Sequence, residues 1–581
     1  MSRFCYTKDE FLLDGKAFQI RSGAIHYFRM PREYWYDRLL KLKECGFNCV
    51  ETYLAWNLHE PEENVFRFDG NLDFIRFIQT AKDLGLYAIV RPGPFICAEW
   101  EAGGLPAWLL RYEDVHIRCN NAVFVEKAKK YLDTVLPMIR PYCIEEGGNV
   151  IMVQIENEYG SYGNDKSYLN GLYDIFRTNL PDCVFFTSDG TDIFRLIAGR
   201  IENCLSMSNF GSSVIPLMSG LKSNFPDQPA MCAEFWCGWF DHWHENHHRR
   251  SAESLEAEID AIMKNKYNFN LYMFFGGTNF GFMNGANYND GQYMPTVTSY
   301  DYDAPLNESG DRTEKYYAIR NVIKRYISVP DLTAKDSEKR AYGNVRFTAG
   351  LTLTEALRYI GKEYTSPVTD NMEKFGVDYG YILYRTRLAA TSVEKFLYLD
   401  DLHDRAVVML DGKIIAVRER GVDESAVSLP ETDKESELSV LVENMGRINF
   451  GYVMFDKKGV RAIRHGRQNV FGYNIVPLPM DNLDKIVFLE SVEAPFGVPA
   501  FYRGELTADK VCDTFLRLDG FSRGFVTVNG FNIGRYDTNA GPQKTLYVPG
   551  TLLHTGVNEI IVFDSQATNA LDAKSVNVAE I

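Results

Sequence analysis

The sequence predicts an α/β fold: a (β/α)8 barrel, residues 1–328, followed by two all-β domains, residues 329–487 and 488–581. Strand-like and helix-like segments alternate from residue 19 to about 325, whereas the later segments are short and strand-like. Two of the later segments, residues 404–416 and 522–534, also share one pattern of apolar residues around a turn dipeptide. At 581 residues the chain is too long for one hydrophobic core, so several domains are expected.

Eight apolar segments of strand length are expected to form the barrel. They end near "SGAIHYF", "VETYLAWN", "LYAIVRPGP", "VIMVQIENE", "VFFTSDG", "CLSMSNFG", "PAMCAEFW" and "LYMFFGG". Helical spacing of apolar residues is clearest in residues 34–45, 72–84, 125–139, 168–176, 255–263 and 313–327. Eight such units in about 300 residues match a TIM barrel. A doubly wound sheet would need an early phosphate-binding glycine loop, and the sequence has none.

A short hairpin is expected before the first barrel strand. In "EFLLDGKAFQI", Asp14-Gly15 lies between two apolar runs, which is a tight-turn signal. We expect this hairpin to cover the bottom of the barrel.

The two all-β domains are expected to be similar sandwiches. "DRAVVMLDGKIIA" (404–416) and "SRGFVTVNGFNIG" (522–534) share one pattern, with turns at Asp411-Gly412 and Asn529-Gly530. Each is followed by one further strand, "LSVLVEN" or "EIIVFD". Duplication favours two sandwiches, although generic hairpin chemistry also explains the pattern.

Charge and composition exclude several partners. The net charge of −16 argues against nucleic acid or an anionic membrane. No apolar window is long enough to span a bilayer, and the first residues resemble no signal peptide. The eleven cysteines show no zinc-ligand spacing, so we expect reduced thiols in a cytoplasmic protein. The oligomeric state is left open, with a homodimer among the options.

Acidic residues follow several predicted strands, where a barrel of this type builds its active site. They are Glu99 and Glu101 after strand three, Glu156 and Glu158 after strand four, Asp189 after strand five, and Glu234 at strand seven. Strands four and seven face each other across an eight-stranded ring. Glu158 and Glu234 are therefore expected to point at one small ligand from opposite sides.

Two carboxyls across a pocket suit glycoside cleavage, where one protonates the departing oxygen and the other attacks the sugar or activates water. Asn157, beside Glu158, is placed to bind a hydroxyl near the reacting carbon. A single glutamate at a strand end is more often a solvated loop residue. The matched pair, ringed by Tyr and Trp, favours the catalytic interpretation.

At these residues the chain resembles the family 35 glycoside hydrolases, which are β-galactosidases. The matching stretches are "ETYLAWNLHEP", "RPGPFICAEWEAGGLPAWLL", "QIENEYGSYG", "AEFWCGWFDHW", "NLYMFFGGTNFG" and "TSYDYDAPL", and beyond the barrel "YGYILYRT", "DRAVVMLDG", "LVENMGRINFGY" and "VNGFNIGRY". The resemblance implies a TIM barrel followed by two β-domains of jelly-roll, galactose-binding type. Part of the stretch 330–370 is a candidate to pack with the last domain, which leaves that boundary approximate.

The resemblance implies a retaining exo-β-galactosidase that needs no metal and no organic cofactor. Glu158 corresponds to the acid/base and Glu234 to the nucleophile. Tyr53, Ile96, Ala98 and Glu99 match positions that hold the galactose hydroxyls, and Tyr272 and Tyr302 match two further pocket tyrosines. The expected partner is a small β-galactoside. Another exo-β-glycosidase, such as a glucosaminidase, and a non-catalytic carbohydrate-binding protein remain the alternatives.

Three tryptophans follow the expected nucleophile: Trp236, Trp239 and Trp243. The lysosomal members of the family have Tyr where this chain has Trp236. Indole faces stack on sugar rings, so we expect some of the three to line the acceptor side and at least one to be core. By analogy with compact bacterial relatives, a preference for β-1,3-linked galactose on N-acetylhexosamine is expected.

"HENHH" (244–248) fits the H-E-x-x-H pattern of zinc proteases. That pattern requires a helix with both histidines on one face. The stretch "DHWHENHHRR" is polar and lacks helical periodicity, so a histidine-rich surface loop is expected here instead.

Overall fold

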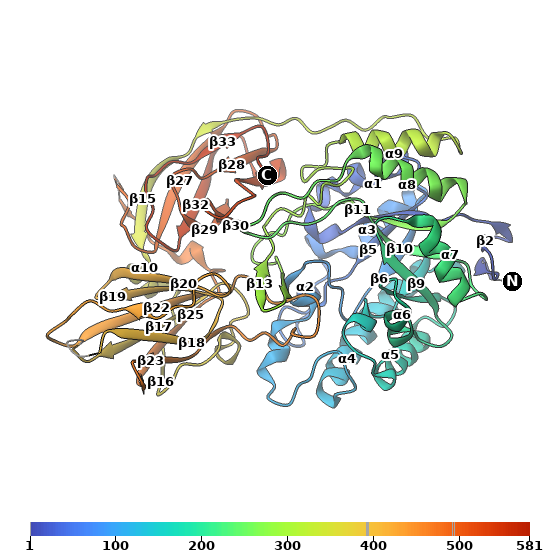
Figure 1. Cartoon of the computed structure of the whole chain (residues 1–581). Helices are drawn as coiled ribbons and strands as arrows, with labels where there is room; N and C mark the ends of the chain where they lie inside the picture. The colour runs from blue at the N-terminus through green and yellow to red at the C-terminus, as the bar shows by residue number, and fades with distance from the viewer. Residues whose placement is uncertain (1, 391–393, 491, 493) are drawn as a thin grey trace.

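Eight parallel strands close into a barrel in the computed structural model, which describes residues 2–390, 394–490, 492 and 494–581. The strand order around the ring is β10-β11-β4-β5-β6-β7-β8-β9. Their bounds are β4 Arg21–Ile25, β5 Cys49–Tyr53, β6 Tyr87–Arg91, β7 Val150–Gln154, β8 Val184–Asp189, β9 Leu205–Phe210, β10 Met231–Trp236 and β11 Asn268–Phe275. Figure 1 shows the barrel in the right half of the molecule, in blue to green. The predicted (β/α)8 barrel is confirmed.

Helices surround the barrel and bury the outer face of its strands, while the inner face is buried by side chains inside the barrel. They are α1 Trp35–Glu44, α2 Trp56–His59, α3 Phe74–Asp83, α4 Ala122–Ile139, α5 Lys166–Asn179, α6 Ile193–Gly199, α7 Val214–Asn224, α8 Ala252–Lys264 and α9 Glu314–Lys324. Side chains of Asp73, Asn121, Asp165, Asp192 and Ser251 accept backbone N–H bonds at the first turns of α3, α4, α5, α6 and α8. Such caps satisfy donors that the first helical turn leaves free. Among the described helices, none has the length and apolar character that crossing a bilayer requires.

The N-terminal hairpin covers the bottom of the barrel, as predicted. Strands β1 Phe4–Tyr6, β2 Phe11–Leu13 and β3 Lys16–Ala17 form a small sheet whose turn uses Asp14 and Gly15 at φ 47° and 75°. Phe4 and Phe11 join one apolar cluster with barrel-strand residues such as Ile151. The opposite end, where the strands terminate, is left free for the site.

Two β-sandwiches follow the barrel, and their larger sheets have the same construction. One runs β16-β25-β17-β22-β19-β20 and the other β26-β15-β27-β32-β29-β30. Each ends in a hairpin with a two-residue turn at positive φ, Asp411-Gly412 or Asn529-Gly530. In each, the second strand after the hairpin, β22 or β32, pairs with the hairpin's first strand, β19 or β29. The prediction of two similar sandwiches is therefore confirmed.

The larger sheets have these bounds: β15 Arg346–Thr352, β16 Tyr364–Ser366, β17 Tyr381–Leu388, β19 Arg405–Leu410, β20 Lys413–Glu419, β22 Ser436–Glu443, β25 Tyr473–Leu478, β26 Leu489–Glu490, β27 Ala500–Ala508, β29 Arg523–Val528, β30 Phe531–Asp537 and β32 Gly556–Asp564. The facing sheets have the strand orders β21-β18-β23-β24 and β14-β33-β28-β31. The strands of the first are β18 Phe396–His403, β21 Val427–Ser428, β23 Gly459–His465 and β24 Gln468–Asn469. The strands of the second are β14 Gly343–Asn344, β28 Thr514–Arg517, β31 Thr545–Val548 and β33 Lys574–Val576. Helix α10, Leu353–Ile360, lies between the two sandwiches in a shared apolar cluster.

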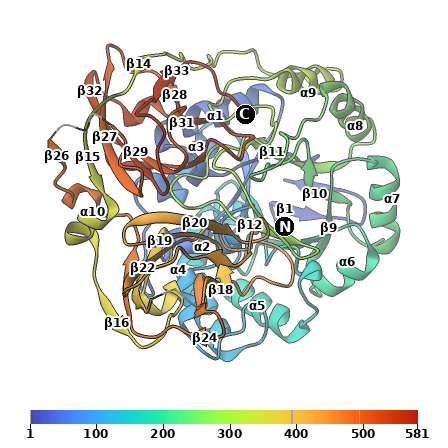
Figure 2. The same ribbon diagram turned by 60° about the vertical axis from the view of Figure 1, so that its left-hand side comes forward.

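The first expected β-domain, residues 329–487, is interrupted in space. Strands β14 and β15 pair with β33 and β27 of the last sandwich, so this early segment joins a domain that begins more than a hundred residues later. In Figure 1 the segment after α9 runs along the top of the molecule to reach it. Figure 2 shows the last sandwich, in red, above the first, in yellow and orange. The exact division of the chain into domains stays a prediction.

Candidate active site

Polar side chains converge where the barrel strands end. Tyr53 and Arg91 are the last residues of β5 and β6, Glu158 follows β7 closely, and Glu234 lies near the end of β10. Because parallel strands share one direction, these ends meet at a single mouth. The strands therefore bring together residues up to 181 positions apart.

Glu234 is held by three donors. The Tyr53 hydroxyl donates to its Oε1 at 2.7 Å, and Arg91 Nη2 donates to the same oxygen at 2.8 Å. The indole N–H of Trp236 lies 3.3 Å from Oε2. Only 6% of Glu234 is exposed, so these donors replace the water that a carboxylate otherwise needs. Oε2 has the weaker contact of the two oxygens and is the freer to react.

Glu158 has a very different environment. It follows the strand with a left-handed backbone, φ 46° and ψ 40°, which turns its side chain into the mouth. Its Oε1 accepts one hydrogen bond, from Asn209 Nδ2 at 3.0 Å. Burial, followed by the negative charge of Glu234, raises the pKa of Glu158 to about 7. A carboxyl of this pKa holds a proton over part of the neutral range.

Asn157 lies between the two carboxyls with its orientation fixed. Its Oδ1 accepts from Arg91 Nη2 at 2.6 Å and from Gln154 Nε2 at 3.0 Å. The amide NH2 group therefore faces away from these donors, and among the described residues it has no acceptor. This group is available to donate to a ligand hydroxyl.

Three other strand-end acids serve structural purposes. Glu156 accepts both arms of the Arg118 guanidinium, at 2.9 and 2.8 Å. Glu101 accepts from Arg447 at 2.6 Å, and Asp189 accepts from the backbone N–H of Gly160 at 2.7 Å. All three are buried and occupied by the protein itself. The two glutamates of "ENE" thus differ: Glu156 supports the turn and Glu158 enters the mouth.

Ile96, Ala98 and Glu99 lie on a loop after β6 that has an unusual backbone. Cys97, Ala98 and Glu99 all have positive φ, at 58°, 59° and 47°. Such conformations cost energy for residues other than glycine and cluster at functional sites. Ile96 and Ala98 are buried, and the side chain of Glu99 accepts a hydrogen bond from Tyr300. Burial raises the pKa of Glu99 to about 7, against the lowering effect of that bond.

Tyr272 and Tyr302 stand beside Glu99. The Tyr272 hydroxyl is 3.1 Å from that of Tyr300, which links it to Glu99. The rings of Tyr272 and Tyr302 pack edge to face with centroids 5.5 Å apart. Both predicted tyrosines therefore lie in one aromatic group with Tyr300. The sequence did not predict Tyr300, which bonds both Tyr272 and Glu99.

The three tryptophans separate into two groups. Trp236 contacts Glu234, and its ring packs edge to face against Trp239 with centroids 5.4 Å apart. Trp239 is 36% exposed, whereas Trp243 is only 4% exposed. Trp239 also lies 6.3 Å from the ring of Tyr302. Trp236 and Trp239 thus border the mouth, and Trp243 is a core residue.

Arg91 and Asn209 contact the carboxyl pair but were not singled out from sequence. Arg91 ends the third barrel strand in "RPGP", and Asn209 is the residue before the end of the sixth, in "CLSMSNFG". A search for all polar residues at predicted strand ends, rather than acids alone, would have included both. Ser188, on the neighbouring strand, bonds the Oδ1 of Asn209 and so directs its Nδ2 toward Glu158.

A TIM barrel with two carboxyls of contrasting environment at its mouth defines the class of glycoside hydrolases. Comparison with protein families agrees. Residues 10–326 match the glycosyl hydrolases family 35, residues 367–479 the first all-beta domain of beta-galactosidase, and residues 499–558 the beta-galactosidase galactose-binding domain. The chain belongs to glycosyl hydrolase family 35.

Curated relatives span nearly the whole chain. Human beta-galactosidase-1-like protein 3 is 39% identical, over 98% of this chain and 88% of the relative. The beta-galactosidase of Bos taurus is 38% identical over 96% and 90%, respectively. The beta-galactosidase of Xanthomonas manihotis is 39% identical over 93% and 90%.

Proposed function

We propose that this chain is a retaining exo-β-galactosidase, which removes terminal non-reducing β-D-galactose with Glu158 as acid/base and Glu234 as nucleophile. The observation that carries the proposal is the contrast between the two carboxyls. Glu158 has a pKa raised to about 7, mainly by burial. Glu234 is bound by Tyr53 and Arg91 through one oxygen. Cationic and hydroxyl donors favour the ionised form of a carboxyl, and burial favours the neutral form.

In the first step Oε2 of Glu234 attacks the anomeric carbon while the glycosidic C–O bond breaks. The proton of Glu158 passes to the leaving oxygen, so the aglycone departs as a neutral alcohol and Glu158 becomes a carboxylate. In the second step Glu158 takes a proton from water as the water oxygen displaces Glu234. Galactose leaves with its original anomeric configuration, and both carboxyls return to their starting states.

The surrounding residues supply binding. The free NH2 group of Asn157 is placed to donate to the sugar 2-hydroxyl, a contact that strengthens in such transition states. Glu99, Tyr272 and Tyr302 are proposed to hold other galactose hydroxyls, with Tyr53 and the backbone around Ile96 and Ala98. Trp236 and Trp239 are proposed to form the acceptor wall and to favour β-1,3 linkages to N-acetylhexosamine.

The beta-galactosidase relatives support the choice of galactose over other sugars. An exo-β-glucosaminidase would use the same carboxyls and is the nearest alternative. A panel of nitrophenyl glycosides separates them: hydrolysis of the β-galactoside, with the β-glucosaminide and β-glucoside at least tenfold slower, is the expected result.

The nucleophile assignment is tested by covalent trapping. A 2-deoxy-2-fluoro-β-galactosyl inhibitor slows both steps and lets the glycosyl-enzyme accumulate. Peptide mass spectrometry should then place the added sugar on the peptide that contains Glu234. Labelling of Glu158 or Glu99, or the absence of any adduct with an active enzyme, would refute the assignment.

We also propose a reducing compartment such as the cytoplasm. All eleven cysteines lie among the described residues as free thiols, and most of them are buried; the thiols of Cys143 and Cys183 contact each other at 2.8 Å. Unpaired cysteines in this number are typical of proteins kept reduced.

A further inference from the structure

The loop between β10 and α8 gathers five imidazole and carboxylate side chains. They are Asp241, His242, Glu245, His247 and His248. Residues 244–248 form no helix, so the H-E-x-x-H arrangement of a protease is absent from this described loop. His244 turns away instead, and its Nε2 lies 3.3 Å from Glu419 of the first sandwich.

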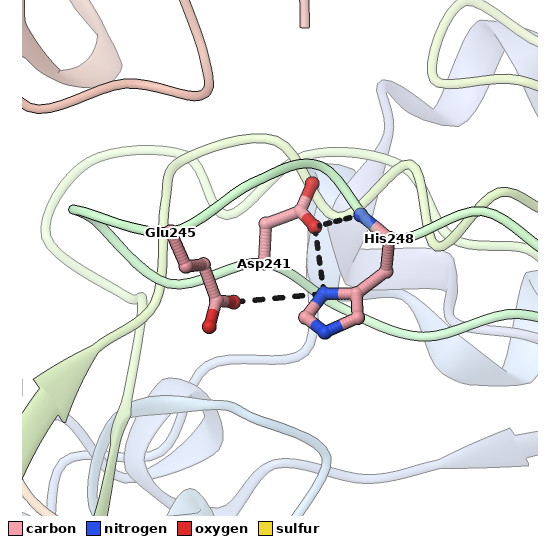
Figure 3. Close-up of side chains that lie close together, drawn as sticks. All are labelled: Asp241, Glu245 and His248. Carbon is pink, nitrogen blue, oxygen red and sulfur yellow. Dashed lines mark hydrogen bonds and ion pairs between the residues drawn. The ribbon is translucent and has the colours of Figure 1, made fainter.

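Three donors of different residues nevertheless converge on one point. His248 Nδ1 lies 3.0 Å from Asp241 Oδ1 and 3.6 Å from Glu245 Oε1, and each of the three residues offers a ligand atom within 4.8 Å of the other two. Figure 3 shows both carboxylates directed at the same imidazole nitrogen. Ligand atoms of a tetrahedral zinc ion are separated by about 3.4 Å, given metal–ligand distances near 2.1 Å. The separations around His248 bracket this value.

The carboxylates are held in place by the loop's own backbone. The N–H of His248 donates to Asp241 Oδ1 at 2.8 Å, and the N–H of His242 donates to Glu245 Oε1. Asp241 is also buried, with 7% of its side chain exposed, whereas 41% of the His248 side chain is exposed. The cluster is therefore organised on the protein side and open on the solvent side.

Each carboxylate also has a second imidazole partner: Asp241 Oδ2 lies 2.7 Å from His247 Nδ1, and Glu245 Oε1 lies 3.0 Å from His242 Nδ1. At His248 both carboxylates approach one Nδ1 atom, which carries at most one proton and can donate to only one of them. The Glu245 contact, at 3.6 Å, is too long for a hydrogen bond. A divalent cation in the same place would contact both carboxylates at once.

We propose that Asp241, Glu245 and His248 bind one divalent transition-metal ion of the zinc type. Each supplies one ligand atom, and solvent occupies the remaining position. Mixed imidazole and carboxylate donors favour this class of metal over Mg²⁺, which prefers oxygen ligands alone. Binding displaces the Nδ1 proton of His248 to solvent. Among the described residues this is the only such group of His, Cys, Asp and Glu donors.

The ion would brace the rim of the active site. The loop begins directly after the strand that carries Glu234, and it includes Trp239, which stacks on Phe240 with ring centroids 4.9 Å apart. Midway along the loop, the N–H of His244 donates to the carbonyl of Ala540, in the last sandwich, at 3.0 Å. A metal here thus ties together a loop that contacts all three parts of the fold. The reaction itself does not use it, so this inference is independent of the proposed function.

The test uses the full-length chain after dialysis against a chelator. Isothermal titration with ZnCl2 should show one ion bound per chain, and His248→Ala and Glu245→Gln should each weaken binding by about tenfold or more. His116→Ala removes an exposed histidine from another loop and should leave binding unchanged. Co²⁺ should give visible d–d absorption in the wild type that is lost in His248→Ala. Circular dichroism establishes that each variant is folded.

Three outcomes would overturn the site. One is the absence of saturable zinc binding below millimolar concentration. Another is equal binding in wild type and in both cluster variants, which would place the ion elsewhere. The third is equal affinity for MgCl2, which would exclude His248 as a ligand.

Discussion

Arg91 Nη2 lies 2.8 Å from Oε1 of Glu234, and the two residues come from strands β6 and β10. The same guanidinium stacks over the Tyr53 ring, 4.1 Å from its centroid, and faces Glu51 at 3.6 Å. Arg91 is only 1% exposed. It therefore acts as the positive centre of the barrel mouth, and it orients Glu234 and Asn157 together.

Arg91→Met should lower kcat/KM by about a hundredfold, the usual cost of removing one oriented electrostatic donor. Arg91→Lys should remain strongly impaired, because one ammonium nitrogen cannot replace both Nη2, which contacts Glu234 and Asn157, and Nε, which faces Glu51. Steady-state kinetics on a nitrophenyl galactoside, with a thermal melt to establish folding, measures this. Near wild-type activity in folded Arg91→Met would show that Glu234 needs no such partner.

Glu158→Ala should affect substrates according to their leaving groups. Substrates with poor leaving groups need protonation and should lose about 10²- to 10⁴-fold in kcat. Activated aryl galactosides should lose much less in their first step. Azide should rescue the variant on activated substrates and yield a β-galactosyl azide, because it attacks the glycosyl-enzyme without a general base. Equal losses on both substrate types, without rescue, would remove Glu158 from the acid/base role.

Asn209→Ala should move the alkaline limb of the pH profile upward. In the proposed mechanism Glu158 must be protonated to act, so activity should be present below its pKa of about 7 and be lost as the pH rises through it. The Asn209 hydrogen bond lowers this pKa by favouring the ionised form. Without that bond the pKa rises, and the limb of kcat/KM should shift to higher pH. A limb that stays in place or moves down would contradict the assignment.

Trp239→Ala should weaken hydrolysis of a galactosyl disaccharide but largely spare a nitrophenyl galactoside. Trp239 is exposed at the mouth, and in the proposed function it contacts the second sugar. Trp243→Phe is the contrasting variant, because Trp243 is buried and its loss should lower stability without changing substrate preference. The ratio of kcat/KM for the two substrates measures the effect. Parallel losses for Trp239→Ala would place this residue in the galactose subsite.

Arg447→Met should destabilise the contact between the barrel and the first sandwich. Arg447 is fully buried and bonds Glu101 of the barrel and Glu373 beyond it, both at 2.6 Å. Removing it leaves two buried carboxylates unpaired, which costs about 3 to 5 kcal/mol. Arg461→Met, from an exposed pair with Asp401, should cost less than about 1 kcal/mol. Urea unfolding measures both, and similar values for the two variants would contradict this account.

The order of elements could be predicted from the sequence because each depends on local signals. Residues 150–155 are apolar enough to form a strand buried on both faces, and Asp411-Gly412 and Asn529-Gly530 adopt the positive φ that tight hairpins need. Glu158 and Glu234 could be paired because the topology of a closed barrel brings strand ends to one mouth. The family resemblance added the remaining pocket positions.

The orientation of the side chains could not be predicted, because it depends on contacts between segments that are far apart in the sequence. Glu156 and Glu158 are two residues apart, yet Arg118 binds one and the other enters the mouth. Trp239 and Trp243 are indistinguishable as residue types, and only packing decides which one is buried. Strand β15 pairs across more than a hundred residues with β27, because hydrogen bonding between strands requires adjacency in space and not along the chain.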